Sequence, residues 1–373
     1  MRGGLNGFAT FLPAGSAAQP LDRSRSFFLK NVLFLLITLI FSVASPGQEI
    51  SFDKKLFFQQ DNPVAFRLEA DLRHLVNNKD RPNPERQVQP ATIVVRLPDS
   101  TELKEQVEIR PRGDFRREEC QMPPIRINFK PAVSPLKKLG SLKFVWPCEN
   151  TDYHEQLVLR EYLAYRLYNL LSERSFRVRL ALVDIADTKD HLRNRSWYGF
   201  FIEDVDDLAK RNGCREIDSV WYPSEQTERE QTTLLALFQY MIGNTDWGIP
   251  VYHNIKLIQP RNDSFARPYA IPFDFDGSGL VNAPYAIPDQ TLGIATVRQR
   301  CYRGFSRSYE EIQAALDVFR SRHTDMLALI NHCELLTSGN RKDMINYIEE
   351  FFQIVASGNQ VKNLFVNQAR SHY

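Results

Sequence analysis

Three widespread catalytic signatures are missing from this chain of 373 residues. It contains no Gly-x-x-x-x-Gly-Lys-Ser/Thr phosphate loop, no His-Glu-x-x-His and no Gly-x-Ser-x-Gly. Their absence excludes the ordinary P-loop NTPases, zincin metalloproteases and α/β-hydrolases. An excess of charge is missing too: the net charge is +2, so the composition requires no nucleic-acid partner. The chain shows no regular repeat and no low-complexity tract, and its composition is that of an ordinary globular protein.

Cysteine is scarce, with five residues whose spacings match no zinc-binding pattern. They are Cys120, Cys148, Cys214, Cys301 and Cys333. Cys120 and Cys148 flank two strands that are predicted to be neighbours, so we expect these two to form a disulfide. The odd count leaves at least one thiol unpaired within the chain. The alternative is that the cysteines are simply small buried residues.

The chain has one long apolar run, at 32–44, which basic residues precede and Ala-Ser-Pro-Gly-Gln follows. This arrangement is typical of a signal peptide, and we assign residues 1–47 to a signal peptide with an N-terminal extension. A retained membrane anchor is the alternative, but the wider stretch 27–44 is interrupted by Lys30 and Asn31 and is shorter than the ~20 apolar residues of a spanning helix. We expect an exported protein, periplasmic or extracellular, with no stable membrane span after signal cleavage and an anchor only if this segment is retained.

The order of secondary-structure patterns predicts an α+β fold. Apolar and polar residues alternate in five short segments of the first half, as they do in half-buried strands of an antiparallel sheet. These segments are 64–70, 91–97, 106–112, 125–129 and 142–146. A capping box formed by Asp152 and Glu155 then marks the start of a helix. Two further strands are predicted at 176–183 and 197–202, and a short helix at 205–210.

Helical patterns dominate the C-terminal part. One apolar helix is predicted at 231–242. A second capping box, Ser308-Tyr309-Glu310-Glu311, opens another helix, and the segments 324–336 and 341–354 are predicted to be further helices. The chain therefore begins with strands and ends with helices.

The segment 243–279 is the most informative part of the chain, because several polar elements follow one another in it. The helix predicted at 231–242 ends at Gly243-Asn244, residue types that tolerate a left-handed helix end. Asp246 is therefore expected in a loop just past a buried helix. Asn254 opens a short strand after that loop.

Two carboxylates close this segment, because a return strand predicted at 268–273 delivers Asp274 and Asp276 to its far end. In phosphoryl transfer of the protein-kinase type, one Asp orients and accepts the proton of the attacking hydroxyl, while an Asn and a second Asp hold magnesium ions that bridge the phosphates. Oxygen ligands suit that hard cation. We therefore predict Asp246 as the catalytic residue and Asn254, Asp274 and Asp276 as metal ligands. The alternative for each Asp is a turn residue, and for the Asn a turn cap.

These motifs resemble the CotH kinase-like family, the spore-coat CotH-related atypical protein kinases. The family pattern of a Gly-Asn-x-Asp loop, a following Asn and a Pro-x-Asp-x-Asp element falls on Gly243, Asn244, Asp246, Asn254, Pro272, Asp274 and Asp276. Arg112-Gly113-Asp114 and the segment 199–203 resemble two further elements of the family. The chain departs from the pattern at three places: Trp247 stands where a basic residue is frequent, Phe201 where the family has Tyr or a similar residue, and Pro123-Pro124 where the family has Lys. The His-Arg-Asp motif of ordinary protein kinases is also absent.

The resemblance implies a two-lobed protein-kinase-like fold. An antiparallel, sheet-rich N-lobe would occupy 48–204, and a mainly helical C-lobe at 205–373 would carry the catalytic and metal loops. It also implies ATP and Mg²⁺ or Mn²⁺ as cofactors, a protein hydroxyl as acceptor, and a bacterial protein of the cell envelope.

Four residues are candidates for contacts with ATP. Kinases hold the α- and β-phosphates with a strand Lys paired to a helix Glu, and Lys143, on a strand just before the helix that carries Glu161, fits this order. Lys130 is the rival, and a solvated surface Lys is the alternative to both. Arg112, in an Arg-rich loop, is a candidate phosphate contact, with a solvated face as its alternative. Glu203 would lie at the lobe junction near adenine, or would be an ordinary acid at a strand end.

Three functional hypotheses follow. The first is an exported CotH-like kinase that transfers the γ-phosphoryl group of ATP to a protein hydroxyl. The second is a catalytically inactive kinase-fold protein with a structural or interaction role in the cell envelope, which Trp247 favours. The third is a hydrolase with Asp274 and Asp276 as acid and base, but their i, i+2 spacing brings them too close for the usual separation across a glycosidic bond. His253 has no partner at metal spacing and is expected to be structural or exposed.

Overall fold

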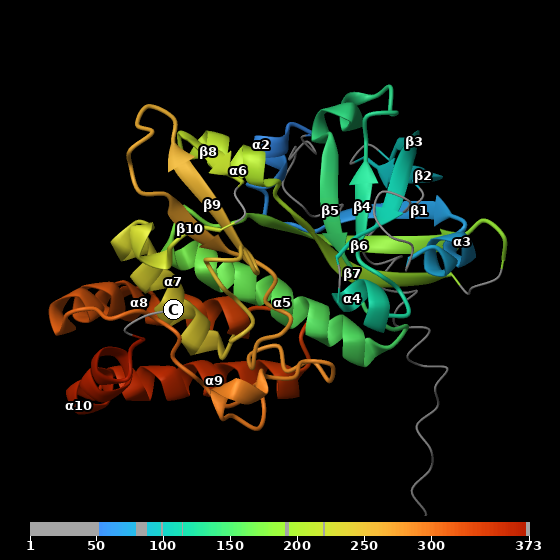
Figure 1. Ribbon diagram of the computed structural model, residues 1–373. Helices are drawn as coiled ribbons and strands as arrows, with labels where there is room; N and C mark the ends of the chain where they lie inside the picture. Colours follow the sequence, from blue (N-terminus) through green and yellow to red (C-terminus); the bar gives the residue numbers. More distant parts are fainter. Residues whose placement is uncertain are drawn as a thin grey trace, which may run out of the picture. The chain divides into compact units, whose positions relative to one another are not determined.

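The first strands of the chain build a barrel (Figure 1). The structure is a computed structural model that describes residues 52–79, 88–97, 100–113, 115–190, 194–218 and 221–370. The predicted signal peptide at 1–47 and Asp114 lie outside the described residues. The barrel strands are β1 (Val64–Ala70), β2 (Gln89–Arg96), β3 (Glu102–Pro111), β4 (Ile125–Asn128), β5 (Ser141–Val145), β6 (Val178–Asp187) and β7 (Arg195–Ile202).

The seven strands close in the order β1-β2-β3-β4-β5-β7-β6. Neighbouring strands run antiparallel except β1 and β6, which pair in parallel from Val64 beside Ala181 to Ala70 beside Asp187. The predicted two-lobed kinase-like fold, with an antiparallel sheet-rich N-lobe and a mainly helical C-lobe, is therefore wrong. The physical reason is the pairing of β1 with β6, which joins the two ends of the sheet into a closed mixed barrel.

Apolar side chains fill the inside of the barrel. Residues of β2 alternate between buried and more exposed positions along the strand, so one face of the strand points inward. The rings of Phe144 and Phe201 lie 4.7 Å apart, and Phe66 lies 5.5 Å and 5.6 Å from them. Aromatic pairs at such distances add about 0.5–1.5 kcal/mol each beyond burial. The barrel is therefore a firm support for the polar residues that its strands carry outward.

A long helix, α5 (Asp152–Leu171), packs on β7 with one side and on α8 with another. Thr151 caps its start by accepting a hydrogen bond from the His154 amide. Tyr165 is buried, and its ring lies 4.6 Å from that of Phe275. The helix thus connects the core beside the barrel with the loop that follows β10.

The remaining elements include a second sheet and most of the helices. Three strands, β8 (Cys214–Ile217), β9 (Ile255–Pro260) and β10 (Tyr269–Pro272), form an antiparallel sheet of order β10-β9-β8. The other helices are α2 (Lys54–Phe57), α3 (Leu72–Asn77), α4 (Phe115–Glu119), α6 (Val205–Arg211), α7 (Arg229–Ile242), α8 (Tyr309–Asn331), α9 (Ser338–Val355) and α10 (Gly358–Val361). Across the described residues, no helix combines the length and the apolar character that a membrane crossing requires.

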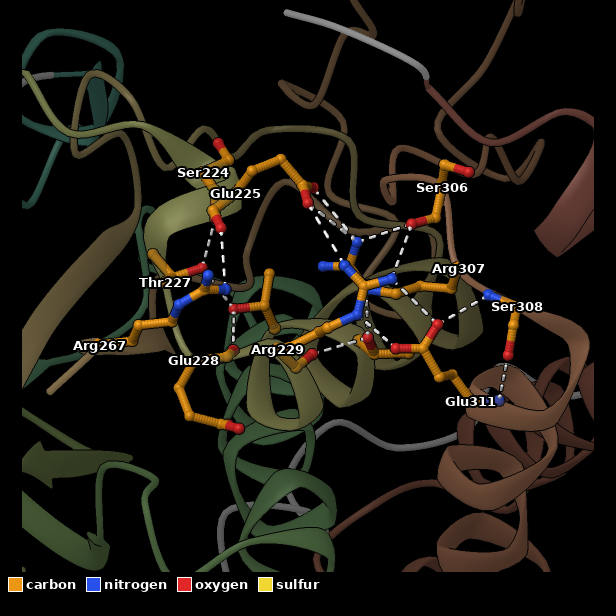
Figure 2. A network of polar contacts seen from close by, with 12 residues as sticks. Ser224, Glu225, Thr227, Glu228, Arg229, Arg267, Ser306, Arg307, Ser308 and Glu311 are labelled. Carbon is orange, nitrogen blue, oxygen red and sulfur yellow. Dashed lines mark hydrogen bonds and ion pairs between the residues drawn. The ribbon is translucent and has the colours of Figure 1, made fainter.

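A polar network holds the starts of α7 and α8 (Figure 2). The buried guanidinium of Arg307 donates to Glu225 at 3.2 Å. Arg229, the first residue of α7, donates to both carboxylate oxygens of Glu311. Glu311 also completes a capping box with Ser308, which confirms the predicted helix start. Because the start of α7 is fixed, the position of the loop that follows its C-terminal end is fixed as well.

The predicted disulfide is confirmed, because Cys120 and Cys148 are bonded to each other. The bond joins the residue after α4 to the segment after β5. Cys214, Cys301 and Cys333 are free. The short helix α4 is therefore tied covalently to the barrel.

Candidate active site

A cleft of about 730 Å³ contains six of the eight predicted site residues. They are Asp246, Asn254, Asp274, Asp276, Lys143 and Arg112. Lys143 comes from the barrel strand β5 and Arg112 from the loop after β3. The acidic residues come from the loops after α7 and β10. The other two predicted residues, Glu161 and Glu203, do not line this cleft.

Asp246 lies in the loop after α7, as predicted. α7 ends at Gly243 in the left-handed conformation, with φ 66°, and a Cβ there would come within 2.1 Å of the Tyr347 hydroxyl. The buried Asn244 accepts a hydrogen bond from the Asp246 amide at 3.0 Å. The Asp246 side chain itself is 55% exposed. The loop backbone is thus fixed while the carboxylate stays accessible.

Two adjacent residues contact the Asp246 carboxylate. His253 Nε2 lies 2.5 Å from Oδ1, and Asn254 Nδ2 donates to Oδ2 at 2.9 Å and to the Asp246 carbonyl at 2.8 Å. The hydrogen bond with Asp246 raises the pKa of His253, although partial burial opposes the rise. The His253 side chain is 54% exposed, which agrees with the prediction that it is structural or exposed, but the contact with Asp246 was not predicted. The position of His253 directly before Asn254 is the signal that could have found it.

Asp274 and Asp276 follow β10 and do not lie within it. Asp274 has φ 63°, an uncommon backbone conformation for a residue other than glycine, and its amide donates to the buried Tyr165 hydroxyl at 2.8 Å. Asp276 is buried and accepts a hydrogen bond from the Tyr285 hydroxyl at 3.1 Å. Burial raises the pKa of Asp276, and the charge of Asp274 adds to the rise. The two carboxylates are therefore near enough to repel each other.

Gly277 brings the two acidic loops together. A Cβ at Gly277 would lie 3.5 Å from the Cβ of Asp246 and 3.7 Å from its Oδ2. Asp246 also acts electrostatically on Asp276. The candidate catalytic residue and the candidate metal ligands thus gather in one part of the cleft.

The residues in this part of the cleft fit a magnesium or manganese ion. Mg²⁺ is usually bound by one or two carboxylates together with substrate phosphates. Asp274 and Asp276 supply two carboxylates whose mutual repulsion a cation would relieve. The side-chain oxygen of Asn254 is a third donor, because its nitrogen is occupied by Asp246. In the described ranges, no three His, Cys, Asp or Glu side chains are grouped to hold a metal ion by themselves, so the phosphates would have to complete the ion's ligands.

Cations line the barrel side of the cleft. Burial lowers the pKa of Lys143 to about 8, and the charge of Arg112 contributes. Burial also lowers the pKa of Arg112, although Asp274 opposes this effect. The Lys143 ammonium lies 5.3 Å from the centre of the Phe273 ring. Over the part of the chain that the structure describes, neither Lys143 nor Arg112 forms an ion pair. Burial of an unpaired charge is costly, and a bound anion would supply the missing partner.

Glu161 pairs with Arg116, so the predicted Lys143–Glu161 ion pair is wrong. Arg116 Nη1 lies 3.0 Å from Glu161 Oε2, and their side chains are 8% and 2% exposed. Arg116 Nε also lies 3.7 Å from Asp276 Oδ2. The physical reason is that α4 inserts Arg116 between the two acids. The Arg-rich loop was the only sequence signal for this residue, and it did not indicate an acidic partner.

Glu203 belongs to a structural ion pair. Its carboxylate accepts hydrogen bonds from Arg211 at 2.9 Å and 3.0 Å and from the Arg177 amide at 3.0 Å. These contacts tie β7 to the start of β6 and to α6. Glu203 therefore holds these elements together, and its predicted contact with adenine stays a prediction.

Comparison with models of known protein families finds no match to this chain, and comparison with curated proteins finds none either. A functional assignment therefore depends on the geometry of the cleft and on the motifs in 243–279.

Proposed function

We propose that the protein transfers the γ-phosphoryl group of ATP to a protein hydroxyl, as the CotH-like kinases that it resembles do. One observation carries the proposal: one cleft is lined by Asp246, Asp274 and Asp276 and also by Arg112 and Lys143, two cations that form no ion pair with any other described residue. A metal-bound nucleoside triphosphate presents a cation to the acids and phosphate oxygens to the Arg and Lys. The proposal concerns this chemistry and requires no two-lobed fold.

Asp246 would act on the acceptor. The acceptor oxygen forms a bond to the γ-phosphorus, and the bond from that phosphorus to the β,γ-bridging oxygen breaks, so ADP leaves. Asp246 takes the proton of the hydroxyl. Asp274, Asp276 and Asn254 would hold the metal ion. When bound, Mg²⁺ or Mn²⁺ would neutralise negative charge on the phosphate oxygens.

Arg112 and Lys143 would bind the phosphates from the barrel side. A guanidinium forms two parallel hydrogen bonds to phosphate oxygens, whereas an ammonium acts as a point charge. Arg116 would not contact ATP, because it is engaged with Glu161 and lies beside Asp276. Its role would be to keep the Asp276 carboxylate in place.

Label transfer tests the proposal. The full chain is incubated with γ-labelled ATP and Mg²⁺ or Mn²⁺, with the protein itself and casein as acceptors. We expect incorporation of label, a decrease of about 10²-fold or more in Asp274→Ala, and no change in Asp325→Ala, an exposed aspartate paired with Arg322 on α8. Wild-type protein that transfers no label with either metal and shows no thermal shift with ATP would refute the proposal.

A catalytically inactive structural or interaction protein of the cell envelope is the second candidate. The pairing of Glu161 with Arg116 favours it, because Lys143 then lacks the helix glutamate that kinases use. Nucleotide binding separates the two candidates. A rise in melting temperature with ATP and Mn²⁺ supports the kinase, and no rise at millimolar ATP supports the inactive protein.

We also propose that the protein is exported, with 1–47 as its signal peptide. The bond between Cys120 and Cys148 supports this, because disulfides persist mainly in oxidising compartments. N-terminal sequencing of the protein isolated from its cell envelope is the test. A start near residue 48 is expected, and a retained segment would identify a membrane anchor instead.

Lys143 is expected to make ATP affinity depend on pH. Because burial lowers its pKa to about 8, the ammonium loses its proton as the pH rises through that value, and phosphate loses a charged partner. We expect the Kd for ATP to rise about tenfold between about pH 7 and 10, the equivalent of losing ~1.4 kcal/mol. Isothermal titration calorimetry measures this. Lys143→Arg keeps its charge and should flatten the curve, and equal slopes for the two proteins would exclude this role.

A further inference from the structure

Both oxygens of the Asp246 carboxylate are engaged. Oδ1 lies 2.5 Å from His253 Nε2, and Oδ2 accepts from Asn254 Nδ2 at 2.9 Å. An ionised carboxylate can only accept hydrogen bonds, so His253 Nε2 carries the hydrogen. His253 lines the same cleft as Asp246, and 54% of its side chain is exposed. The pair therefore lies where an acceptor hydroxyl would have to arrive.

The backbone around His253 is held independently of the ring. Gly248 and His253 exchange two backbone hydrogen bonds of 2.9 Å. The residues on either side, Tyr252 and Asn254, have positive φ values of 56° and 52°. Such conformations persist only where the surrounding structure imposes them, and they cluster at functional sites. Removal of the imidazole would leave these backbone bonds in place.

We infer that His253 is a positioning residue for the acceptor hydroxyl and acts through Asp246, an inference that rests on the proposed phosphoryl transfer. The terminal torsion of an Asp side chain has a broad distribution, so an exposed carboxylate samples many orientations. The bond from His253 to Oδ1 restricts this rotation, and the bond from Asn254 to Oδ2 supports it. A lone pair of the carboxylate then stays directed at the hydroxyl. Catalytic bases are often oriented by a third group in this way.

An ordinary surface contact is the competing interpretation. Exposed ion pairs contribute about 0–1 kcal/mol to stability and carry no catalytic role. The chain contains such a pair: His323 Nε2 lies 3.1 Å from Glu349 Oε1, with both side chains about one third exposed. Neither residue lines the cleft. His323→Ala is therefore a matched control for His253→Ala.

Kinetics separate the two interpretations. His253→Ala is expected to lower kcat by about 10–100-fold, the usual effect of losing a residue that orients a ligand or base, and to leave the KM for ATP within about twofold. His253→Gln places an amide donor near the position of the ring Nε2 and should restore most of the rate. His253→Asn, whose amide is shorter, should not. His323→Ala should match the wild type in both constants.

A readout independent of activity completes the test. In ¹H–¹⁵N spectra of the full chain labelled at histidine, the Nε2 resonance of His253 should shift in Asp246→Ala, and that of His323 should not. An unshifted His253 resonance, a wild-type kcat in His253→Ala, or a His253→Gln protein as slow as His253→Ala would each overturn the inference. Wild-type protein without phosphoryl transfer would instead overturn the proposed function, and the positioning role with it, even if the resonance shifts.

Discussion

Asp246→Asn is expected to lower kcat for phosphoryl transfer by about 10²–10⁴-fold, the range for losing a positioned general base. Asparagine keeps the size of the side chain and can still contact His253 and Asn254, but its amide does not take up the proton of the hydroxyl. The KM for ATP should change little, because Arg112 and Lys143 remain in place. Steady-state kinetics with labelled ATP measure both constants.

A second aspartate in a turn provides the control. Asp263 lies between β9 and β10, is exposed, and accepts a hydrogen bond from the Phe265 amide at 2.9 Å. Asp263→Asn should leave kcat within about twofold of the wild type, as surface changes away from a site usually do. If Asp246→Asn behaved like Asp263→Asn, Asp246 could not be the residue that takes the proton.

Arg116→Ala is expected to lower the free energy of unfolding by about 3–5 kcal/mol, because it leaves Glu161 buried without its cation. The two side chains are 8% and 2% exposed, so the pair is largely shielded from water. The variant should also require more Mn²⁺ for activity, since Arg116 lies beside Asp276. Urea unfolding followed by circular dichroism measures the stability.

The loss of folding stability in Arg116→Ala should depend on pH. Burial raises the pKa of Glu161, while Arg116 lowers it, so removing Arg116 raises the folded-state pKa further. When the pKa of a carboxyl group is higher in the folded than in the unfolded protein, the group contributes its full stability at pH values below the unfolded-state pKa. This contribution is lost as the pH rises through the folded-state pKa. Because the pKa of Glu161 is already raised to about 8 with Arg116 present, the extra loss of stability in Arg116→Ala should grow as the pH rises above about 8 and shrink as the pH falls below that value. The exposed pair of Arg322 and Asp325 is the control, and Arg322→Ala should cost at most about 1 kcal/mol. A loss in Arg116→Ala no larger than this would contradict the buried-pair argument.

Local sequence rules predicted the parts of the site that lie close together in the chain. Gly243 ends α7 in the left-handed conformation, which places Asp246 in the expected loop. The alternating pattern at 64–70 corresponds to β1 and the one at 125–129 to β4. The roles of Arg116 and His253 were missed for different reasons. Arg116 meets Glu161 across 45 positions of sequence, a contact that no local pattern encodes, whereas the His253 contact depends on the close turn that starts at Gly248.

Two errors concern where elements end and which elements pair. The helix predicted to start at Thr324 is part of α8, which runs unbroken over Tyr309–Asn331. No Gly or Pro interrupts the polar residues 320–325, which cover an exposed side of the helix, so the helix continues through them. The closed barrel was also missed, because alternation identifies a strand and its buried face but not its partner.

The parallel pairing of β1 with β6 also constrains how the chain can be made. Val64 leaves the ribosome long before Ala181, its neighbour in the barrel. A nascent chain that has not yet released 178–202 has β1 with one edge open, and open strand edges invite pairing with other chains. Barrel closure is therefore a late step in the folding of the nascent chain. Chains stalled before that point should be the ones that aggregate or require a holding chaperone.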